Sequence, residues 1–173
     1  MSGGIRNVRA EHITAIDTES AVRIKSSPGR GAYVKDIFVR KMKMKTMKYV
    51  FWMTGYYKSD PDPFFNPRAL PDIENINYRD MVAENVTMPG YLEGIKGDAF
   101  KGICMSNITI GLAENPKEML WNCTNIEGVT SRVKPRACGL LREHKNVECP
   151  FPKDRLPIEK VKFKNCLVHA IVV

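Results

Sequence analysis

The sequence predicts an all-β protein that folds as a right-handed parallel β-helix. Three observations support this prediction. Short β-branched segments follow one another, each introduced by Asn, Asp or Gly, and hardly any stretch has a helical period. Four segments fit one template: apolar, any residue, Asn/Asp/Gly, apolar, four residues of any kind, apolar. Their spacing of 29, 39 and 27 residues is typical of solenoid coils that carry loop insertions.

The four segments are residues 5–13, 34–42, 73–81 and 100–108, and their anchors are Asn7, Asp36, Asn75 and Gly102. An Asn or Asp side chain can bond the local backbone and tolerates left-handed geometry, so a tight turn is expected at each anchor. The flanking Ile and Val residues then point into a shared core. An antiparallel β-sandwich is the alternative, but it favours shorter, more even spacing and Asn-Gly hairpin turns, which this sequence lacks.

Two regions are expected. Residues 1–130 form the coils, from which a proline-rich loop at residues 59–72 projects. The repeat fades after Thr130, so residues 131–173 are predicted to be a C-terminal cap and tail.

The 173 residues carry a formal charge of +8, from 27 Lys and Arg against 19 Asp and Glu. This balance favours an anionic partner, which is a nucleic acid, an acidic membrane surface or an acidic polymer. The strongest basic run is residues 34–48. Strand alternation places Lys41, Lys43 and Lys45 on one face and Met42 and Met44 on the other, which is typical of a solvated strand over a core. Attraction of an acidic polysaccharide is the second interpretation, and nucleic acid a distant third.

All five cysteines lie in the last 70 residues, and none forms the C-x-x-C pairs of a zinc site, so no metal is expected. Disulfide bonds are favoured instead. Pairs Cys123–Cys138 and Cys149–Cys166 would close short loops and leave Cys104 buried in a strand.

Three N-glycosylation sequons, at Asn85, Asn107 and Asn122, agree with a secreted chain. The N-terminal residues nevertheless contain no apolar run that could act as a signal peptide. Secreted features without a signal predict that a front part is missing. The apolar tract at residues 167–173 is interrupted by His169 and is too short to span a bilayer, so no membrane segment is expected.

Residues 20–31 contain the most suggestive group of cations. Alternation places Arg23 and Lys25 on the same strand face, about 7 Å apart, with Ile24 turned to the core. Such a pair suits neighbouring carboxylates on a polymer, and Arg can hold one carboxylate in a bidentate fork. Taken alone, Arg-x-Lys is a weak motif, for which a solvated strand face is the simpler interpretation.

The motif does not stand alone. Together with residues 49–57, 75–80, 85–87, 92–95 and 102–110, it resembles plant polygalacturonase-like proteins of glycoside hydrolase family 28. The resemblance implies a right-handed parallel β-helix and inverting hydrolysis of α-1,4-linked galacturonic acid in pectin, in the cell wall and without a cofactor. It also implies that Arg23 and Lys25 hold galacturonate carboxylates and that Tyr57 lies in the same cleft. Packing of Tyr57 on the coils is the other interpretation of that residue.

The sequence departs from the family at the catalytic carboxylates. The Asn-Thr-Asp, Asp-Asp and Gly-His-Gly segments of the family are absent. Asp17 with Glu19, and Asp60 with Asp62, are expected in solvated or turn positions. The histidines His12, His144 and His169 are isolated and support neither nucleophilic catalysis nor metal binding.

Two functions follow from the sequence. The first is the substrate-binding part of a pectin-hydrolysing glycosidase that is inactive as given, and the second is a non-catalytic cell-wall protein that binds acidic polysaccharide. An intact solenoid of this kind is expected to be a monomer, whereas one cut across its coils would expose strand edges and associate.

Overall fold

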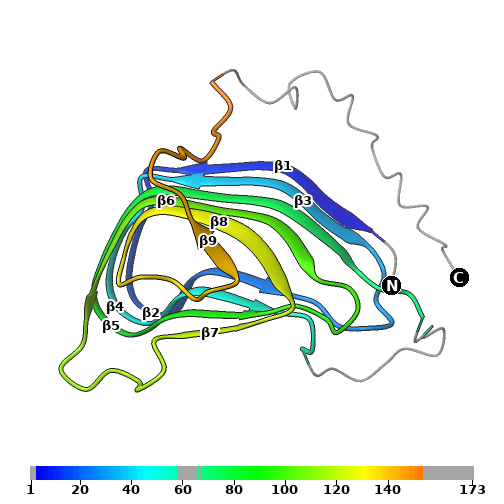
Figure 1. Ribbon diagram of the computed structural model, residues 1–173, viewed down its shortest axis with the longest axis horizontal. Coiled ribbons are helices and arrows are strands. Elements are labelled where there is room, and N and C mark those ends of the chain that lie inside the picture. Colours follow the sequence, from blue (N-terminus) through cyan, green and yellow to red (C-terminus); the bar gives the residue numbers. More distant parts are fainter. Residues whose placement is uncertain (1–2, 58–65, 67, 154–173) are drawn as a thin grey trace, which may run out of the picture.

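A computed structural model describes residues 3–57, 66 and 68–153, which form nine β-strands and no helix (Figure 1). The strands are β1 (Gly4–Glu11), β2 (Thr14–Lys25), β3 (Tyr33–Arg40), β4 (Lys43–Thr54), β5 (Asp72–Glu93), β6 (Phe100–Leu112), β7 (Trp121–Thr124), β8 (Ile126–Lys134) and β9 (Leu141–Glu143). All pairs between these strands are parallel. The described residues form no helix long and apolar enough for a membrane span.

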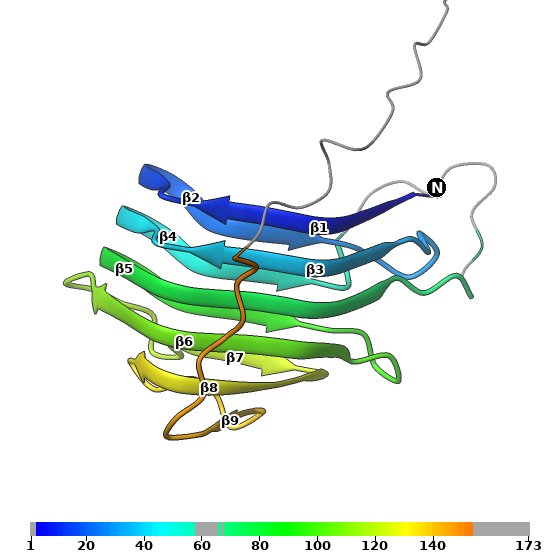
Figure 2. The same cartoon turned by 90° about the horizontal axis from the view of Figure 1, so that it is seen from above.

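The strands stack into successive coils. One face follows the order β1-β3-β5-β6-β8-β9, and a second face consists of β2, β4, the later part of β5, and β7. Figure 2 shows the coils lying one above the other along the solenoid axis. Because every coil hydrogen-bonds to the next coil in parallel, the predicted parallel β-helix is confirmed.

Each coil bends at residues with positive φ, and these residues align from coil to coil in three corner columns. The first column is Asn7, Asp36, Asn75 and Gly102; the second is His12, Lys41, Asp80, Asn107 and Arg132; the third is Asp17, Thr46 and Asn85. Their φ angles lie between 52° and 63°. The first column matches the four predicted anchors, so the Asn, Asp and Gly preference reflects left-handed backbone at a corner.

Side chains of one column bond to each other along the axis. Asn75 Nδ2 donates to Asp36 Oδ1 over 2.6 Å, and Arg6 Nε donates to the other oxygen of the same carboxylate over 2.8 Å. These two bonds hold the pKa of Asp36 below its usual value. In the second column Asn107 Nδ2 donates to Asp80 Oδ1, also over 2.6 Å. The columns therefore fix the corners and link the coils to each other.

The core lies inside the coils. Ile37, Ile76 and Ile103 occupy one register position of three successive coils and are buried. The alternation predicted for residues 41–45 is confirmed, because Met42 and Met44 are buried while the three intervening lysines are exposed.

A strap formed by residues 145–153 runs across the first face along the solenoid axis (Figure 2). It meets β8, β6, β5, β3 and β1 in turn. Its contacts are Ser131 Oγ to Lys145 O (3.3 Å), Cys149 N to Ser106 Oγ (3.0 Å), Arg79 Nη1 to Cys149 O (3.2 Å), the Arg40 guanidinium over the Phe151 ring (3.9 Å) and Arg9 Nη1 to Pro152 O (3.2 Å). The strap therefore connects the first coil to the last.

One of the two expected disulfides differs in the structure, because Cys149 lies in the strap and bonds to β6. The Cys123–Cys138 bond is present, but Cys149 is bonded to Cys104, so the pairing of Cys149 with Cys166 is wrong. Alternation along β6 turns Ile103 and Met105 into the core and Cys104 outward, beneath the strap. Cys166 lies outside the described residues.

The expected boundary between residues 130 and 131 falls inside β8, which ends at Lys134, and β9 adds a further short parallel strand. Of the expected loop at 59–72, residues 59–65 and 67 lie outside the described part, and Asp72 already begins β5. The expected tail is described only as far as Lys153.

Candidate functional site

Arg23 lies in a row of outward-facing residues that crosses four strands of the second face. The register pairs Arg23 with Trp52, Trp52 with Tyr91, and Tyr91 with Asn122. Their neighbours Ile24, Met53 and Leu92 are buried in the core, so alternation turns the row outward. Neighbouring rows are spaced by two residues along each strand, which places Lys25 level with Thr54, Glu93 and Thr124.

The Arg23 side chain is held between a ring and a carboxylate. Its guanidinium carbon lies 4.0 Å from the centre of the Trp52 ring, and Nη1 donates to Glu19 Oε2 over 2.9 Å. The Trp52 ring stacks in turn on Tyr91, with 6.3 Å between centroids and an interplanar angle of 23°. A cation over a Trp face is stabilised by the ring quadrupole. The ring therefore restricts the guanidinium, whose donor edge is turned to the Glu19 carboxylate.

Lys25 is placed by Tyr57. Its Nζ donates to the Tyr57 hydroxyl over 3.3 Å and lies 4.3 Å from the centre of the same ring. The Tyr57 backbone N–H donates to Ser26 O over 2.8 Å, and the ring meets Trp52 edge-on at 6.2 Å. The structure thus brings together the three residues that the sequence analysis selected, Arg23, Lys25 and Tyr57.

The neighbouring Tyr56 has a different role. Its hydroxyl accepts the backbone N–H of Lys96 over 2.9 Å, while its own N–H donates to Thr54 Oγ1 over 3.0 Å. Tyr56 therefore anchors a turn, and Tyr57 is the tyrosine that contacts Lys25. Packing and cation contact are combined in Tyr57, so the two interpretations of this residue are compatible.

Two carboxylates border the cations. Glu19 forms the ion pair with Arg23 and lies 3.9 Å from Lys48 Nζ. Glu93 accepts a bond from Thr54 Oγ1 over 2.7 Å. The pKa of Tyr91 is raised, first by its partial burial and then by the charge of Glu93. Glu19 was expected in a solvated or turn position. It is exposed to solvent, but it also occupies the donor edge of Arg23.

No local sequence motif reveals a role for Trp52, Tyr91 or Glu93. The spacing that links the anchors contains the missing signal, because Trp52 follows Arg23 by 29 residues and Tyr91 follows Trp52 by 39. These are the intervals from Asn7 to Asp36 and from Asp36 to Asn75. Adding these repeat intervals in turn to the residue number of Arg23 leads to Trp52 and Tyr91, and so predicts the aromatic residues of the row.

The other candidate residues lie elsewhere. His12 and Asp17 are corner residues in the second and third columns, and the backbone N–H of His144 donates to Thr130 O. Asp60, Asp62 and His169 lie outside the described residues. Within the described part of the chain, no group of three His, Cys, Asp or Glu side chains could hold a metal ion.

The sequons occupy two kinds of position. Asn85 and Asn107 are exposed corner residues, and each donates a side-chain bond to the preceding coil, to Thr46 and Asp80 respectively. Asn122 is half-buried and continues the row of Arg23, Trp52 and Tyr91.

Comparison with known proteins identifies the family of this chain. The sequence pattern of Glycosyl hydrolases family 28 matches residues 2–138. The chain belongs to this family. A relative described as a probable polygalacturonase of Vitis vinifera is 54% identical over 169 residues. That alignment covers 96% of this chain but 34% of the relative, so the chain spans about a third of the relative's length. No solved structure matches significantly.

Proposed function

We propose that this chain is the substrate-binding part of a polygalacturonase-type glycosidase and that it binds the α-1,4-linked galacturonate chain of pectin. The observation that carries the proposal is the outward pair Arg23 and Lys25, two residues apart on β2, each resting on an aromatic ring. Alternate residues of an extended strand are about 7 Å apart, so Arg23 and Lys25 can each meet a different carboxylate of an acidic polymer. Membership of family 28 and the similarity to a probable polygalacturonase support this substrate.

Three side chains on the second face, Arg23, Lys25 and Tyr57, can bind the polymer. A galacturonate carboxylate replaces Glu19 at the donor edge of Arg23, because both present the same two oxygens to the guanidinium fork. Lys25 supplies a second positive charge to the next carboxylate. The Tyr57 hydroxyl, which accepts the bond from Lys25, can donate its own proton to a sugar oxygen.

Cleavage of the polymer requires a pair of carboxyl groups in addition to the binding residues of this face. Inverting glycosidases need a carboxylic acid and a carboxylate on opposite sides of the scissile bond, about 6.5–9.5 Å apart. The Asn-Thr-Asp and Asp-Asp segments that supply the carboxylates in this family, and the Gly-His-Gly segment that follows them, do not occur in the 173 residues. We therefore propose that the chain by itself binds the polymer without cleaving it. The second candidate function is a non-catalytic cell-wall protein that binds acidic polysaccharide through the same residues.

The two disulfides and the three sequons support a secreted, cell-wall location for either function. A genomic reading frame that joins the missing segments upstream of Met1 would contradict the non-catalytic candidate. A reading frame that cannot join them would contradict the glycosidase candidate.

Calorimetric titration tests the binding proposal. We expect tetragalacturonate to bind the purified chain, and we expect its fully methyl-esterified form to bind at least tenfold more weakly because the ester removes the charge. The double variant Arg23→Gln, Lys25→Gln should weaken this preference. A control pair, Arg132→Gln with Lys134→Gln, removes two cations from exposed positions on β8. Equal affinity for both ligands, or an unchanged preference in the Arg23 and Lys25 variant, would refute the proposal.

A further inference from the structure

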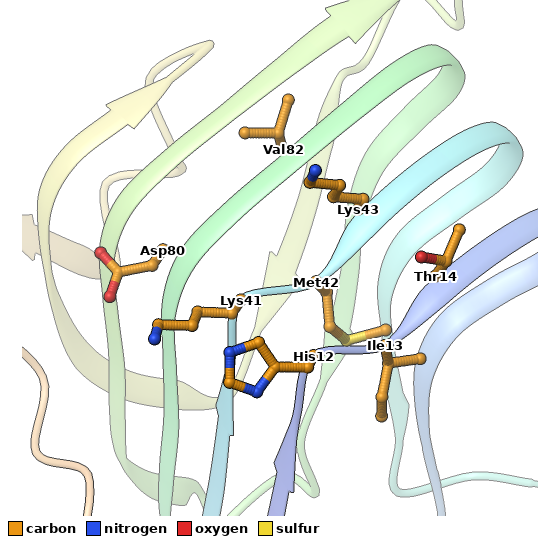
Figure 3. A pocket seen from close by; sticks show the side chains of 8 residues that line it. All are labelled: His12, Ile13, Thr14, Lys41, Met42, Lys43, Asp80 and Val82. Atoms are coloured by element: carbon orange, nitrogen blue, oxygen red, sulfur yellow. The ribbon is translucent and has the colours of Figure 1, made fainter.

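A second group of cations lies on the short side of the coils between the second and third corner columns. Two adjoining hollows of about 430 and 420 Å³ lie here and share Thr14, Lys43 and Val82. Figure 3 shows Thr14, Lys43 and Val82 projecting from the corner on one side, with Lys41 and Asp80 projecting in another direction. We call the region formed by Thr14, Ile16, Lys41, Lys43, Lys45 and Val82 the lysine groove.

The lysines of this groove are free to meet an anion. Within residues 3–57, 66 and 68–153, no carboxylate forms an ion pair with Lys41, Lys43 or Lys45. Cations of the neighbouring face are paired instead, as Arg40 is with Glu11 and Arg79 with Glu148. Lys43 and Lys45 lie at alternate positions of β4, about 7 Å apart, and Lys41 lies at the corner before this strand, so positive charge is concentrated at the groove.

Two carboxylates, Asp80 and Glu84, also line the hollows. They differ in whether neighbouring groups compensate their charge. Asp80 accepts bonds from Asn107 Nδ2 and Arg79 Nε, so its charge is already compensated. Burial alone would raise the pKa of Asp80, but these two bonds outweigh it and hold the pKa below its usual value. Glu84 has no such partner among the described residues and lines the second hollow. The groove therefore keeps a net positive charge, opposed by Glu84.

The floor of the groove is apolar. Ile16 is 57% exposed and Val82 51%, so both present aliphatic surface to solvent. Pockets for small molecules combine apolar walls with a few charged groups that fix orientation. A sugar ring has the matching surfaces, because its C–H face packs on aliphatic side chains while its carboxylate meets a lysine. Neither hollow is lined by Phe, Tyr or Trp, the side chains on which nucleic-acid bases stack.

From this arrangement we propose that the lysine groove is a second binding site for an acidic polysaccharide chain. The proposal rests on the proposed function for the choice of polymer, but it uses different residues. Ile16 and Arg23 are seven residues apart on β2, or about 23 Å in an extended strand, with the Asp17 corner between them. The two sites therefore act separately on short oligomers. A long polymer that reaches both sites binds more tightly through its raised effective concentration.

Titration of the full chain with tetragalacturonate tests this inference. The wild-type chain should bind two molecules. The triple variant Lys41→Gln, Lys43→Gln, Lys45→Gln should bind one, and the variant Arg23→Gln, Lys25→Gln should bind the other. A matched triple variant, Lys101→Gln, Lys117→Gln, Lys153→Gln, makes the same charge change at exposed lysines outside the groove and should keep both sites. Glu84→Gln should strengthen the groove site about threefold, which is typical for the loss of one exposed like charge.

Four outcomes would overturn the inference. The first is two sites in the groove triple variant, and the second is a single site in the wild-type chain. The third is the loss of a site in the matched triple variant as well, and the fourth is displacement of the groove ligand by an oligothymidylate of the same charge. The last two would indicate attraction of any polyanion. If instead the Arg23 and Lys25 variant keeps both sites while the groove variant loses one, the proposed function fails and the groove site stands. Circular dichroism of each variant confirms that the fold is intact.

Discussion

The guanidinium carbon of Arg23 lies 4.0 Å from the centre of the Trp52 ring, while its Nη1 donates to Glu19 Oε2 over 2.9 Å. A cation on a Trp face is stabilised by about 0.5–2 kcal/mol, depending on its exposure to solvent. The ring thus holds Arg23 in place, and the Glu19 carboxylate occupies the position at which a uronate would bind. Two predictions follow from these separate roles.

Replacing Trp52 should weaken uronate binding although Trp52 need not touch the ligand. In Trp52→Ala the guanidinium loses its ring and gains rotamer freedom, so we expect affinity for tetragalacturonate to fall about five- to tenfold. Trp52→Phe should restore part of the affinity because a smaller ring remains under Arg23. Calorimetry gives both affinities. An unchanged affinity in Trp52→Ala would show that the ring does not position Arg23.

Removing the charge of Glu19 should have the opposite effect. In Glu19→Gln the uronate no longer competes with a charged partner for the donor edge of Arg23, and we expect binding to strengthen about threefold. The same substitution in an Arg23→Gln background should change little. Weaker binding in the single variant would mean that Glu19 orients Arg23 rather than competing with the ligand.

The third corner column contains a residue poorly suited to its backbone. Thr46 has φ of 59°, which is unfavourable for a β-branched side chain, whereas Asn tolerates it. Thr46→Asn should therefore raise the free energy of unfolding by about 0.5–1 kcal/mol, which denaturant titration can measure. Thr109→Asn, on exposed and extended β6, is the control and should be neutral or slightly destabilising. A destabilised Thr46→Asn variant would contradict this account of the corners.

Stability should fall in acid because of Asp36. Bonds from Arg6 and Asn75 hold its pKa in the folded chain below that of the unfolded chain, about 3.9. The stabilisation is therefore fully present above that pH and is lost as the pH falls through the folded-state pKa. Asp36→Asn keeps a residue that tolerates the corner but removes the charge, so unfolding measured from pH 6 to pH 2 should depend less on pH. An identical pH profile would exclude this contribution.

The two disulfides should differ in their contribution. Cys104–Cys149 closes a 45-residue separation and Cys123–Cys138 one of 15 residues. On chain entropy alone, the longer loop should contribute about 1 kcal/mol more to the free energy of unfolding. We expect Cys104→Ala with Cys149→Ala to cost more than Cys123→Ala with Cys138→Ala in denaturant titrations. Hydrogen exchange should also speed up in the strap in the first pair of variants, and unchanged strap protection would contradict its anchoring role.

Local rules predicted much of this fold. The anchors Asn7, Asp36 and Asn75 could be recognised because a left-handed corner selects for particular side chains. The alternation of Lys43 and Met44 followed from the two-residue period of a strand. Arg23 and Lys25 were selected by the same period together with the family resemblance.

Features that depend on distant segments were not predicted. The Cys104–Cys149 bond depends on a strap that runs across the strands, and no local pattern in the sequence encodes that path. The stack of Trp52 on Tyr91 depends on the register between coils, which the repeat intervals contain but which no single segment reveals. The lysine groove likewise arises only where β2, β4 and β5 lie side by side.

The chain's two tryptophans allow the most direct test of the central claim, that the Arg23 face binds uronate. Trp52 lies on this face, whereas Trp121 is 8% exposed and packs on Phe51 in the core. In a ¹⁵N-labelled chain titrated with tetragalacturonate, the indole N–H resonance of Trp52 should shift while that of Trp121 stays in place. The Trp52 shift should disappear in Arg23→Gln with Lys25→Gln. A Trp52 resonance that does not move at saturating ligand would contradict the account.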